Sequence, residues 1–155
     1  MEVTIPQFGD LSLEFLVLDF TGTLSINGRL IPGVAERLIK ISRLLKIYVL
    51  TADTFGRARE ELAELPLTLN IITGHAEDAF KAEFVINLGA PRVVAMGNGN
   101  NDVLMLKKAG LGVAVIEGEG CSSAAIMAAD LSVRSILDGL DLLLEPLRIK
   151  AGLRS

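Results

Sequence analysis

Short apolar runs alternate along the chain with longer segments in which apolar residues recur at helical spacing. The runs lie at residues 15–18, 47–50, 67–72, 92–96 and 111–115, with a shorter one at 131–133. This alternation is typical of parallel strands joined by crossover helices. We therefore predict an α/β fold built on a central parallel sheet.

The segments between the runs predict the helices. A first helix is predicted with Pro32 in its first turn. One face of this helix carries Val34, Leu38, Ile41, Leu44 and Leu45. Further helices are predicted at about 54–65, around 79–85, at about 101–109, near 122–129 and at 136–144. Before the first run, residues 3–5 and 11–13 flank a turn at 6–10, which predicts an N-terminal β-hairpin that protects a sheet edge.

Length and composition predict one folded domain over residues 1–155. The chain is 50% hydrophobic with a mean hydropathy of +0.48, which excludes a disordered chain. The net charge is −4 and no basic block occurs, so we expect no nucleic-acid partner. No signal peptide or apolar run of membrane-spanning length is present, and the single cysteine fits a reducing compartment. We expect a cytoplasmic protein without a membrane partner.

Polar clusters follow three of the predicted strands. They are the segments 19–23 (DFTGT), 51–53 (TAD) and 97–102 (GNGNND). Because the carboxyl ends of parallel strands meet in a crevice where ligands bind, we expect these clusters to lie close together. A carboxylate such as Asp19 could there attack phosphorus, beside the backbone and hydroxyl groups of its own segment.

Each of these residues also has a purely structural interpretation. Asp19 could begin a turn, Asn100 or Asn101 could cap a helix, and Thr51 could bind backbone groups at a strand end. Lys81 follows Glu77 by four residues and could form a surface ion pair with it.

Taken together, Asp19 to Thr23, Thr51, Lys81 and the segment 97–102 resemble the four motifs of the haloacid dehalogenase superfamily of phosphohydrolases. The first motif is most similar to that of P-type ATPases. The segments 109–115 and 128–130 resemble those that follow the fourth motif in the phosphorylation domain of these ATPases. The resemblance implies a Rossmann-like three-layer fold. It also implies a phosphatase in which Asp19 forms an aspartyl-phosphate.

The resemblance further implies the roles of the other residues. Mg²⁺ would be bound by Asp19, the Thr21 carbonyl, Asn98 and Asp102. The phosphoryl group would be held by Phe20, Thr51, Ala52 and Lys81. Asp102 could bind the metal directly or orient Asn98, and the sequence leaves both open.

Two residues depart from the pattern of many phosphatases in this superfamily. Thr21 stands where a second Asp acts as general acid and base, and threonine does not ionise near neutral pH, so we expect slow turnover. Asn98 stands where a metal-binding Asp is usual, and the loss of one negative charge should weaken Mg²⁺ binding.

Motif spacing predicts that the domain has no substrate-selecting cap. Only 31 residues separate Asp19 from Thr51, and 29 separate Thr51 from Lys81. The site should therefore be open unless a flap at 23–31, a second copy of the chain or a macromolecular substrate covers it. We expect His75 to have a surface or capping role rather than a catalytic one. We expect Cys121 to be a packing residue whose pKa a helix start could lower.

These observations favour a Mg²⁺-dependent phosphatase acting on a small phosphorylated substrate or a phosphoprotein. The first alternative is a catalytically weak regulatory module that keeps the phosphate and metal pocket, which Asn98 favours. The second is a phosphorylatable receiver domain. Receivers carry an acidic pair before the phosphorylated Asp, and no such pair ends an earlier core strand here.

Overall fold

Six parallel strands form the centre of the computed structural model, which describes residues 1–154. They are β3 (Phe15–Leu18), β6 (Lys46–Thr51), β7 (Thr68–Ile71), β8 (Val93–Gly97), β9 (Leu111–Val115) and β10 (Leu131–Val133). Their order across the sheet is β10-β9-β8-β3-β6-β7, and each neighbouring pair is parallel. The predicted α/β class and parallel sheet are confirmed, and the strand positions agree closely with the apolar runs.

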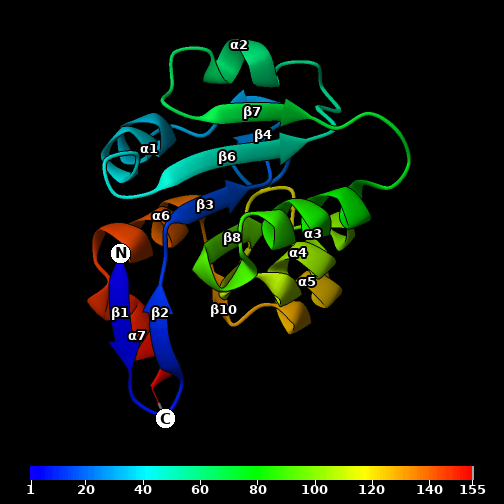
Figure 1. Ribbon diagram of the computed structural model, residues 1–155. Helices are drawn as coiled ribbons and strands as arrows, with labels where there is room; N and C mark the ends of the chain where they lie inside the picture. Colours follow the sequence, from blue (N-terminus) through cyan, green and yellow to red (C-terminus); the bar gives the residue numbers. More distant parts are fainter. Residues whose placement is uncertain (155) are drawn as a thin grey trace.

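Helices cover both faces of this sheet (Figure 1). They are α1 (Val34–Ile41), α2 (Ala58–Leu62), α3 (Glu77–Asn87), α4 (Val103–Lys108), α5 (Ser123–Ala128), α6 (Ile136–Leu144) and α7 (Leu147–Leu153). Two 3₁₀ helices, η1 (Ala90–Arg92) and η2 (Asn100–Asp102), precede β8 and α4. One face packs against α1 and α6, and the other against α3, α4 and α5. The result is the expected three-layer arrangement.

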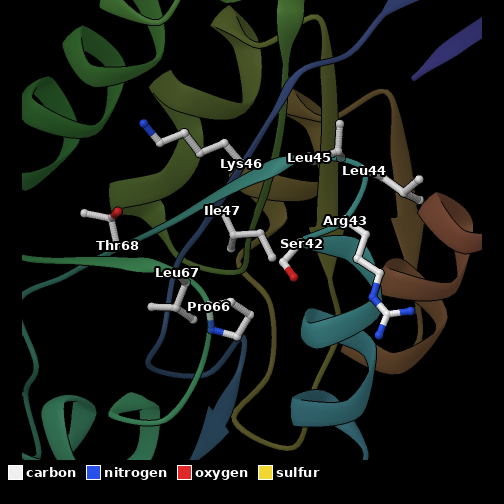
Figure 2. Close-up of a pocket in the computed structure, with 9 residues that line it drawn as sticks. All are labelled: Ser42, Arg43, Leu44, Leu45, Lys46, Ile47, Pro66, Leu67 and Thr68. Atoms are coloured by element: carbon white, nitrogen blue, oxygen red, sulfur yellow. The ribbon is translucent and has the colours of Figure 1, made fainter.

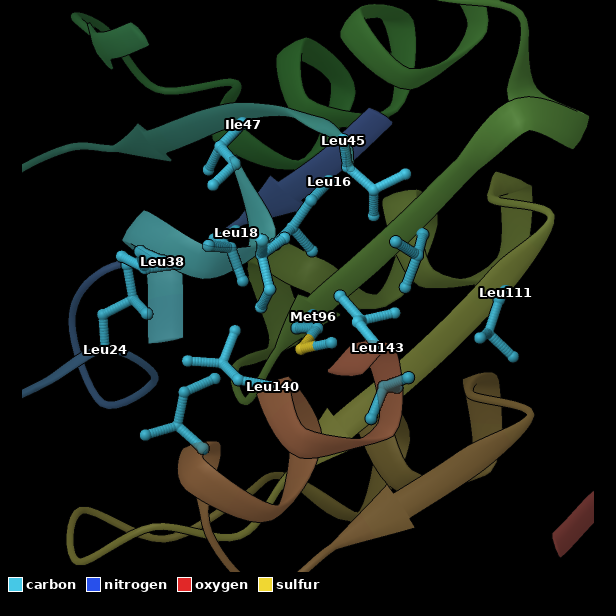
Figure 3. Close-up of a cluster of buried hydrophobic side chains, with 14 of the residues drawn as sticks. Leu16, Leu18, Leu24, Leu38, Leu45, Ile47, Met96, Leu111, Leu140 and Leu143 are labelled. Carbon is cyan, nitrogen blue, oxygen red and sulfur yellow. The ribbon is translucent and has the colours of Figure 1, made fainter. Parts of the chain in front are cut away.

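The core divides along the alternation of side chains in the strands. In β3, Leu16 and Leu18 face the cluster formed with α1 and α6, whereas Val17 faces the opposite cluster. Figure 3 shows the first cluster, in which Leu140 of α6 and Met96 of β8 lie among leucines of several elements. Because both faces of β3 are buried, the carboxyl end of this central strand has a fixed position.

Two helices are shorter than their apolar patterns predict. The first ends at Ile41, so Leu44 lies in the turn before β6 and is 54% exposed. The second begins at Ala58 rather than at 54, because the chain turns first. In that turn Asp53 has a φ of 53°, and its Oδ1 accepts hydrogen bonds from the N–H groups of Arg57 and Ala58.

The N-terminal hairpin is confirmed, but its predicted role is wrong. Strands β1 (Glu2–Ile5) and β2 (Gly9–Ser12) pair with each other and with no strand of the described part of the main sheet. The hairpin continues directly into β3 at the centre of the sheet and packs on α7, so it covers no edge (Figure 1).

Only small elements lie between the motif segments. From Asp19 to Lys81 the chain forms a second hairpin of β4 (Ser25–Ile26) and β5 (Arg29–Leu30), then α1, β6, α2, β7 and the start of α3. None of these is large enough to be a cap domain, as the spacing predicted. In residues 1–154 no helix combines the length and the apolar character that crossing a membrane requires.

Candidate active site

The carboxyl ends of β3, β6, β8 and β9 surround a pocket of about 240 Å³. The residues that line it are Asp19, Thr21, Thr51, Ala52, Thr54, Glu77, Asn98, Gly99, Asn101 and Glu119. Polar segments that are distant in sequence therefore meet at this edge, as the sheet topology predicted.

Lys81 of α3 lies behind the pocket between two carboxylates. Its Nζ donates hydrogen bonds of 2.7 Å to Oδ1 of Asp19 and to Oδ1 of Asp102. Lys81 and Asp102 are fully buried, and Asp19 is 4% exposed. The alternative of a surface pair with Glu77 is wrong, because Lys81 points inward and Glu77 instead accepts a hydrogen bond from Asn101. Asp19 likewise does more than begin a turn, because its carboxylate accepts a hydrogen bond from Lys81 and lines the pocket.

Asp102 positions its neighbours with both carboxylate oxygens. Oδ1 accepts from Lys81, and Oδ2 accepts the backbone N–H groups of Asn98 and Gly99 at 2.9 Å each. The predicted capping by Asn100 or Asn101 is wrong, because the N-cap residue of η2 is Gly99 and that of α4 is Asp102. Gly97 permits the approach, since a Cβ there would lie 2.4 Å from Cγ of Asp102. With these contacts made, Asp102 does not line the pocket.

Thr23 links the first and last motif segments. Its Oγ1 lies 3.2 Å from Oδ2 of Asp19 and 3.1 Å from Oδ1 of Asn98. Nδ2 of Asn98 donates to the carbonyl of Gly120, which fixes the orientation of the amide with its oxygen beside Thr23. The close approach of Asn98 to the first motif segment requires a glycine at position 22. Gly22 has a φ of +76°, and an added Cβ would lie 2.4 Å from Nδ2 of Asn98.

The electrostatics of this cluster favour a bound cation. Burial, with a further contribution from Asp102, raises the pKa of Asp19 to about 7, although Lys81 opposes the rise. Burial lowers the pKa of Lys81, but the two carboxylates raise it more, so the net pKa is above its ordinary value. Lys81 is therefore charged at neutral pH. A further positive charge near Asp19 would favour the carboxylate form of Asp19.

Of the predicted phosphoryl-binding residues, Thr51 and Ala52 line the pocket and Phe20 does not. Thr51 Oγ1 accepts the backbone N–H of Asp53, which confirms its structural role and leaves its hydroxyl proton free to donate. Phe20 is fully buried in the core, and its carbonyl accepts N–H groups of the following turn.

The residues at the pocket fit Mg²⁺ by their chemistry. Asp19 and Asn98 offer oxygen atoms to the same space, and hard divalent cations prefer oxygen ligands. Four carboxylates, those of Asp19, Asp102, Glu77 and Glu119, stand at or behind the pocket against the single ammonium of Lys81. Within residues 1–154, however, no three His, Cys, Asp or Glu side chains converge as a metal site, in agreement with the neutral Asn98.

The sequence did not identify three of the pocket residues as parts of a site: Thr54, Glu77 and Glu119. Glu119 lies in the loop after β9, so the strand-end argument would have found it had it been applied to this strand. Glu77 was considered only as a partner of Lys81. Its place at the pocket depends on how α3 packs, which the sequence does not reveal.

A larger hollow of about 470 Å³ opens at the other end of the sheet (Figure 2). It lies at the amino ends of β6 and β7, where Arg43, Lys46 and Thr68 line it together with mostly apolar residues. Among residues 1–154, no carboxylate or cysteine lines it, so it offers none of the chemistry found around Asp19.

Cys121 and His75 lie near the site but do not enter it. Burial, and then the charge of Asp102, raises the pKa of the Cys121 thiol, so the expectation of a lowered pKa is wrong. His75 is exposed in the loop before α3, as predicted.

Comparison with known proteins identifies relatives in sequence and in structure. Residues 82–129 match the family model of haloacid dehalogenase-like hydrolases. An uncharacterized protein of Methanocaldococcus jannaschii is 51% identical over 63 residues, which are 41% of this chain and 68% of that protein.

Two solved structures share the fold over most of the chain. A 3-deoxy-D-manno-octulosonate 8-phosphate phosphatase from Moraxella catarrhalis, in complex with magnesium, phosphate and the sugar, superposes with a TM-score of 0.65 at 15% identity, covering 90% of each chain. A zinc-transporting PIB-type ATPase in the E2P state superposes with a TM-score of 0.62 at 25% identity, covering 79% of this chain and 20% of the ATPase. The family model, the shared fold and the meeting of the four motif segments together show that the chain belongs to the haloacid dehalogenase superfamily.

Proposed function

We propose that the protein is a Mg²⁺-dependent phosphohydrolase that acts on a small phosphomonoester through Asp19. The observation that carries this proposal is the buried Lys81, which holds the Asp19 carboxylate at the floor of the pocket. Phosphoryl transfer needs an aligned nucleophile and fixed positive charge more than it needs further covalent chemistry. The match to a hydrolase family model supports the proposal.

In the proposed reaction, a carboxylate oxygen of Asp19 attacks phosphorus and the ester P–O bond breaks. The leaving alkoxide departs and takes a proton from water, and the phosphoryl group stays on Asp19 as an acyl phosphate. Water then attacks phosphorus, which releases inorganic phosphate and restores the carboxylate. Thr51 and the backbone at Ala52 would hold the phosphoryl oxygens during both steps.

The proposed ligands of Mg²⁺ are Asp19, the carbonyl of Thr21 and the amide oxygen of Asn98. The bound ion would neutralise charge on the phosphoryl oxygens. We propose Asp102 as a positioning residue, because its oxygens already bind Lys81 and two backbone N–H groups. Thr21 cannot serve as a general acid at neutral pH, so we expect slow turnover.

Hydrolysis of a generic aryl phosphate with and without Mg²⁺ tests the proposal. Asp19→Asn removes the nucleophile and keeps the side-chain shape, so we expect activity to fall by at least about 10³-fold. Asp10→Asn, at an exposed position in the N-terminal hairpin, makes the same chemical change away from the site and should leave activity unchanged. Equal activity of the two variants would refute the role of Asp19.

The second candidate function is a regulatory module that binds phosphate and metal with little catalysis. The observation that favours it is the neutral Asn98 at the proposed metal site. Asn98→Asp separates the two candidates, because it restores one negative charge beside the metal. A large rise in the phosphatase rate and in Mg²⁺ affinity would favour the module, and little change would favour an enzyme that is already competent.

A further inference from the structure

The mouth of the active-site pocket carries two carboxylates that the proposed reaction does not use. Glu77 extends from the first turn of α3, and Glu119 from the loop after β9. We call these two residues the acidic rim. They stand on elements that are far apart in the sequence, and both line the pocket that contains Asp19.

The charges of the acidic rim are not neutralised by a cation. Glu77 Oε2 accepts a hydrogen bond of 2.8 Å from the amide of Asn101, and Glu119 Oε1 accepts one of 2.6 Å from the backbone N–H of Asn27. Both donors are uncharged. Across residues 1–154, neither carboxylate forms an ion pair, and no Lys or Arg side chain lines the pocket.

The contact of Glu119 with Asn27 also fixes the position of the rim. It joins the turn between β4 and β5 to the loop after β9, and Leu30 of the same hairpin donates to Glu61 of α2. The segment predicted as a flap is therefore docked on two sides in this structure, and its mobility stays a prediction. Docked in this way, it helps hold Glu119 beside the pocket.

A second hollow continues from the pocket and gives a leaving group room to extend. It has a volume of about 340 Å³ and shares Glu77 and Asn101 with the pocket. Its other lining residues, His75, Asp78 and Asn100, are polar. In the described part of the chain, no Phe or Tyr lines either hollow, so neither offers a ring on which a nucleobase could stack.

Thr21, which lines the pocket, carries a polar atom without a partner. Its Oγ1 is buried and makes no hydrogen bond within residues 1–154. A buried hydroxyl is normally paired, so a group entering the pocket would complete it. This observation is independent of the acidic rim and points to a ligand in the same place.

We propose that the acidic rim selects the substrate: a small phosphomonoester whose leaving group carries hydroxyl or ammonium groups and no second anion. The inference rests on the proposed function. Carboxylates at the mouth attract ammonium groups and accept hydrogen bonds from hydroxyl groups, whereas they repel a carboxylate or a further phosphate. Nucleoside polyphosphates and phosphorylated sugar acids are then poor substrates.

Three substrates of similar size test the proposal: phosphoethanolamine, glycerol 3-phosphate and 3-phosphoglycerate. Phosphoethanolamine carries an ammonium group, whereas glycerol 3-phosphate and 3-phosphoglycerate differ only at the terminal carbon, which carries a hydroxyl in the first and is a carboxylate in the second. We expect the wild type to have a kcat/KM for the first two that is at least about tenfold higher than for 3-phosphoglycerate. Glu77→Gln and Glu119→Gln keep an oxygen that accepts the same hydrogen bond and remove the charge. Each should reduce this preference about fivefold, mainly by improving the use of 3-phosphoglycerate.

Glu83→Gln is the matched control, because Glu83 is exposed on the same helix as Glu77 and lines neither hollow. It should leave the preference unchanged. If the wild type hydrolyses all three esters equally, or if the rim variants and the control behave alike, the acidic rim does not select the substrate and the proposed function still stands. If none of the esters nor an aryl phosphate is hydrolysed, the proposed function fails, and this inference fails with it.

Discussion

A single buried ammonium balances the two carboxylates at the floor of the site. Lys81 is fully buried and lies 2.7 Å from both Asp19 and Asp102. A buried ion pair adds little net stability, but removing one member leaves the others uncompensated. The same lysine that would hold a phosphoryl group therefore also holds the folded site together before any substrate is bound.

Replacing Lys81 should accordingly cost stability as well as activity. We expect Lys81→Met to lower the free energy of unfolding by about 3–5 kcal/mol at neutral pH without added metal, because two carboxylates remain buried. Urea unfolding measures the change. Lys107→Met, at an exposed position in the last turn of α4, should stay within about 0.5 kcal/mol of the wild type. A similar loss in both variants would show that Lys81 has no special electrostatic role.

The positions of some site residues could be predicted from the sequence, and those of others could not. Asp19 and Asn98 could be placed at one sheet edge because they follow apolar strands directly. Lys81 could not be placed from the residues alone, since its spacing from Glu77 fits an exposed ion pair equally well. Whether a helical residue points inward depends on packing between α3 and its neighbours, which becomes visible only in the structure.

An ion pair joins α1 and α6, which pack on the same face of the sheet. Arg37 of α1 donates from Nε and Nη2 to the two carboxylate oxygens of Asp141 of α6, at 2.7 and 3.1 Å. Both side chains are about one quarter exposed. The hydrogen bonds from Arg37 are the main reason that the pKa of Asp141 is lowered from its ordinary value of 3.8.

The ion pair predicts a pH-dependent contribution to stability. Because the pKa of Asp141 is lower in the folded state, its contribution is present above about pH 4 and is lost as the pH falls through the folded-state pKa. Asp141→Asn should reduce the free energy of unfolding by about 0.5–1 kcal/mol at pH 7. Denaturant unfolding at a series of pH values should show this difference shrinking toward pH 3, whereas a constant difference would contradict the assignment. Asp10→Asn is the control, because Asp10 is exposed in the N-terminal hairpin and does not join two helices. It should leave the free energy of unfolding unchanged at each pH.

Elements were predicted well where apolar runs are short and continuous, and less well at helix ends. The strands β3, β9 and β10 and the helix α6 begin and end where the pattern placed them. The start of α2 was predicted too early, because the side chain of Asp53 accepts hydrogen bonds from the N–H groups of Arg57 and Ala58 and holds the chain in a turn before the helix. Apolar spacing does not reveal such a local hydrogen bond. The helix α7 was not predicted, since it buries only Ile149 and so has little apolar pattern.

For the molecule as a whole, the sequence predicted the sheet, the hairpin and a site without an inserted cap, but not the carboxylates Glu77 and Glu119 at the pocket. Motif spacing excluded an inserted cap, and the structure contains only a hairpin and short helices there. An open site was expected to select poorly. The acidic rim offers a physical basis for selection without an inserted cap, because its charges can attract or repel a leaving group directly.

Trapping the acyl phosphate shows whether phosphate is transferred through Asp19. The enzyme is mixed with an aryl phosphate and Mg²⁺, quenched in acid and reduced with borohydride, and its peptides are identified by mass spectrometry. We predict a reduced side chain at position 19 that requires both substrate and Mg²⁺ and is absent from Asp19→Asn. Hydrolysis without any modification at this position, or modification of a different residue, would contradict the account.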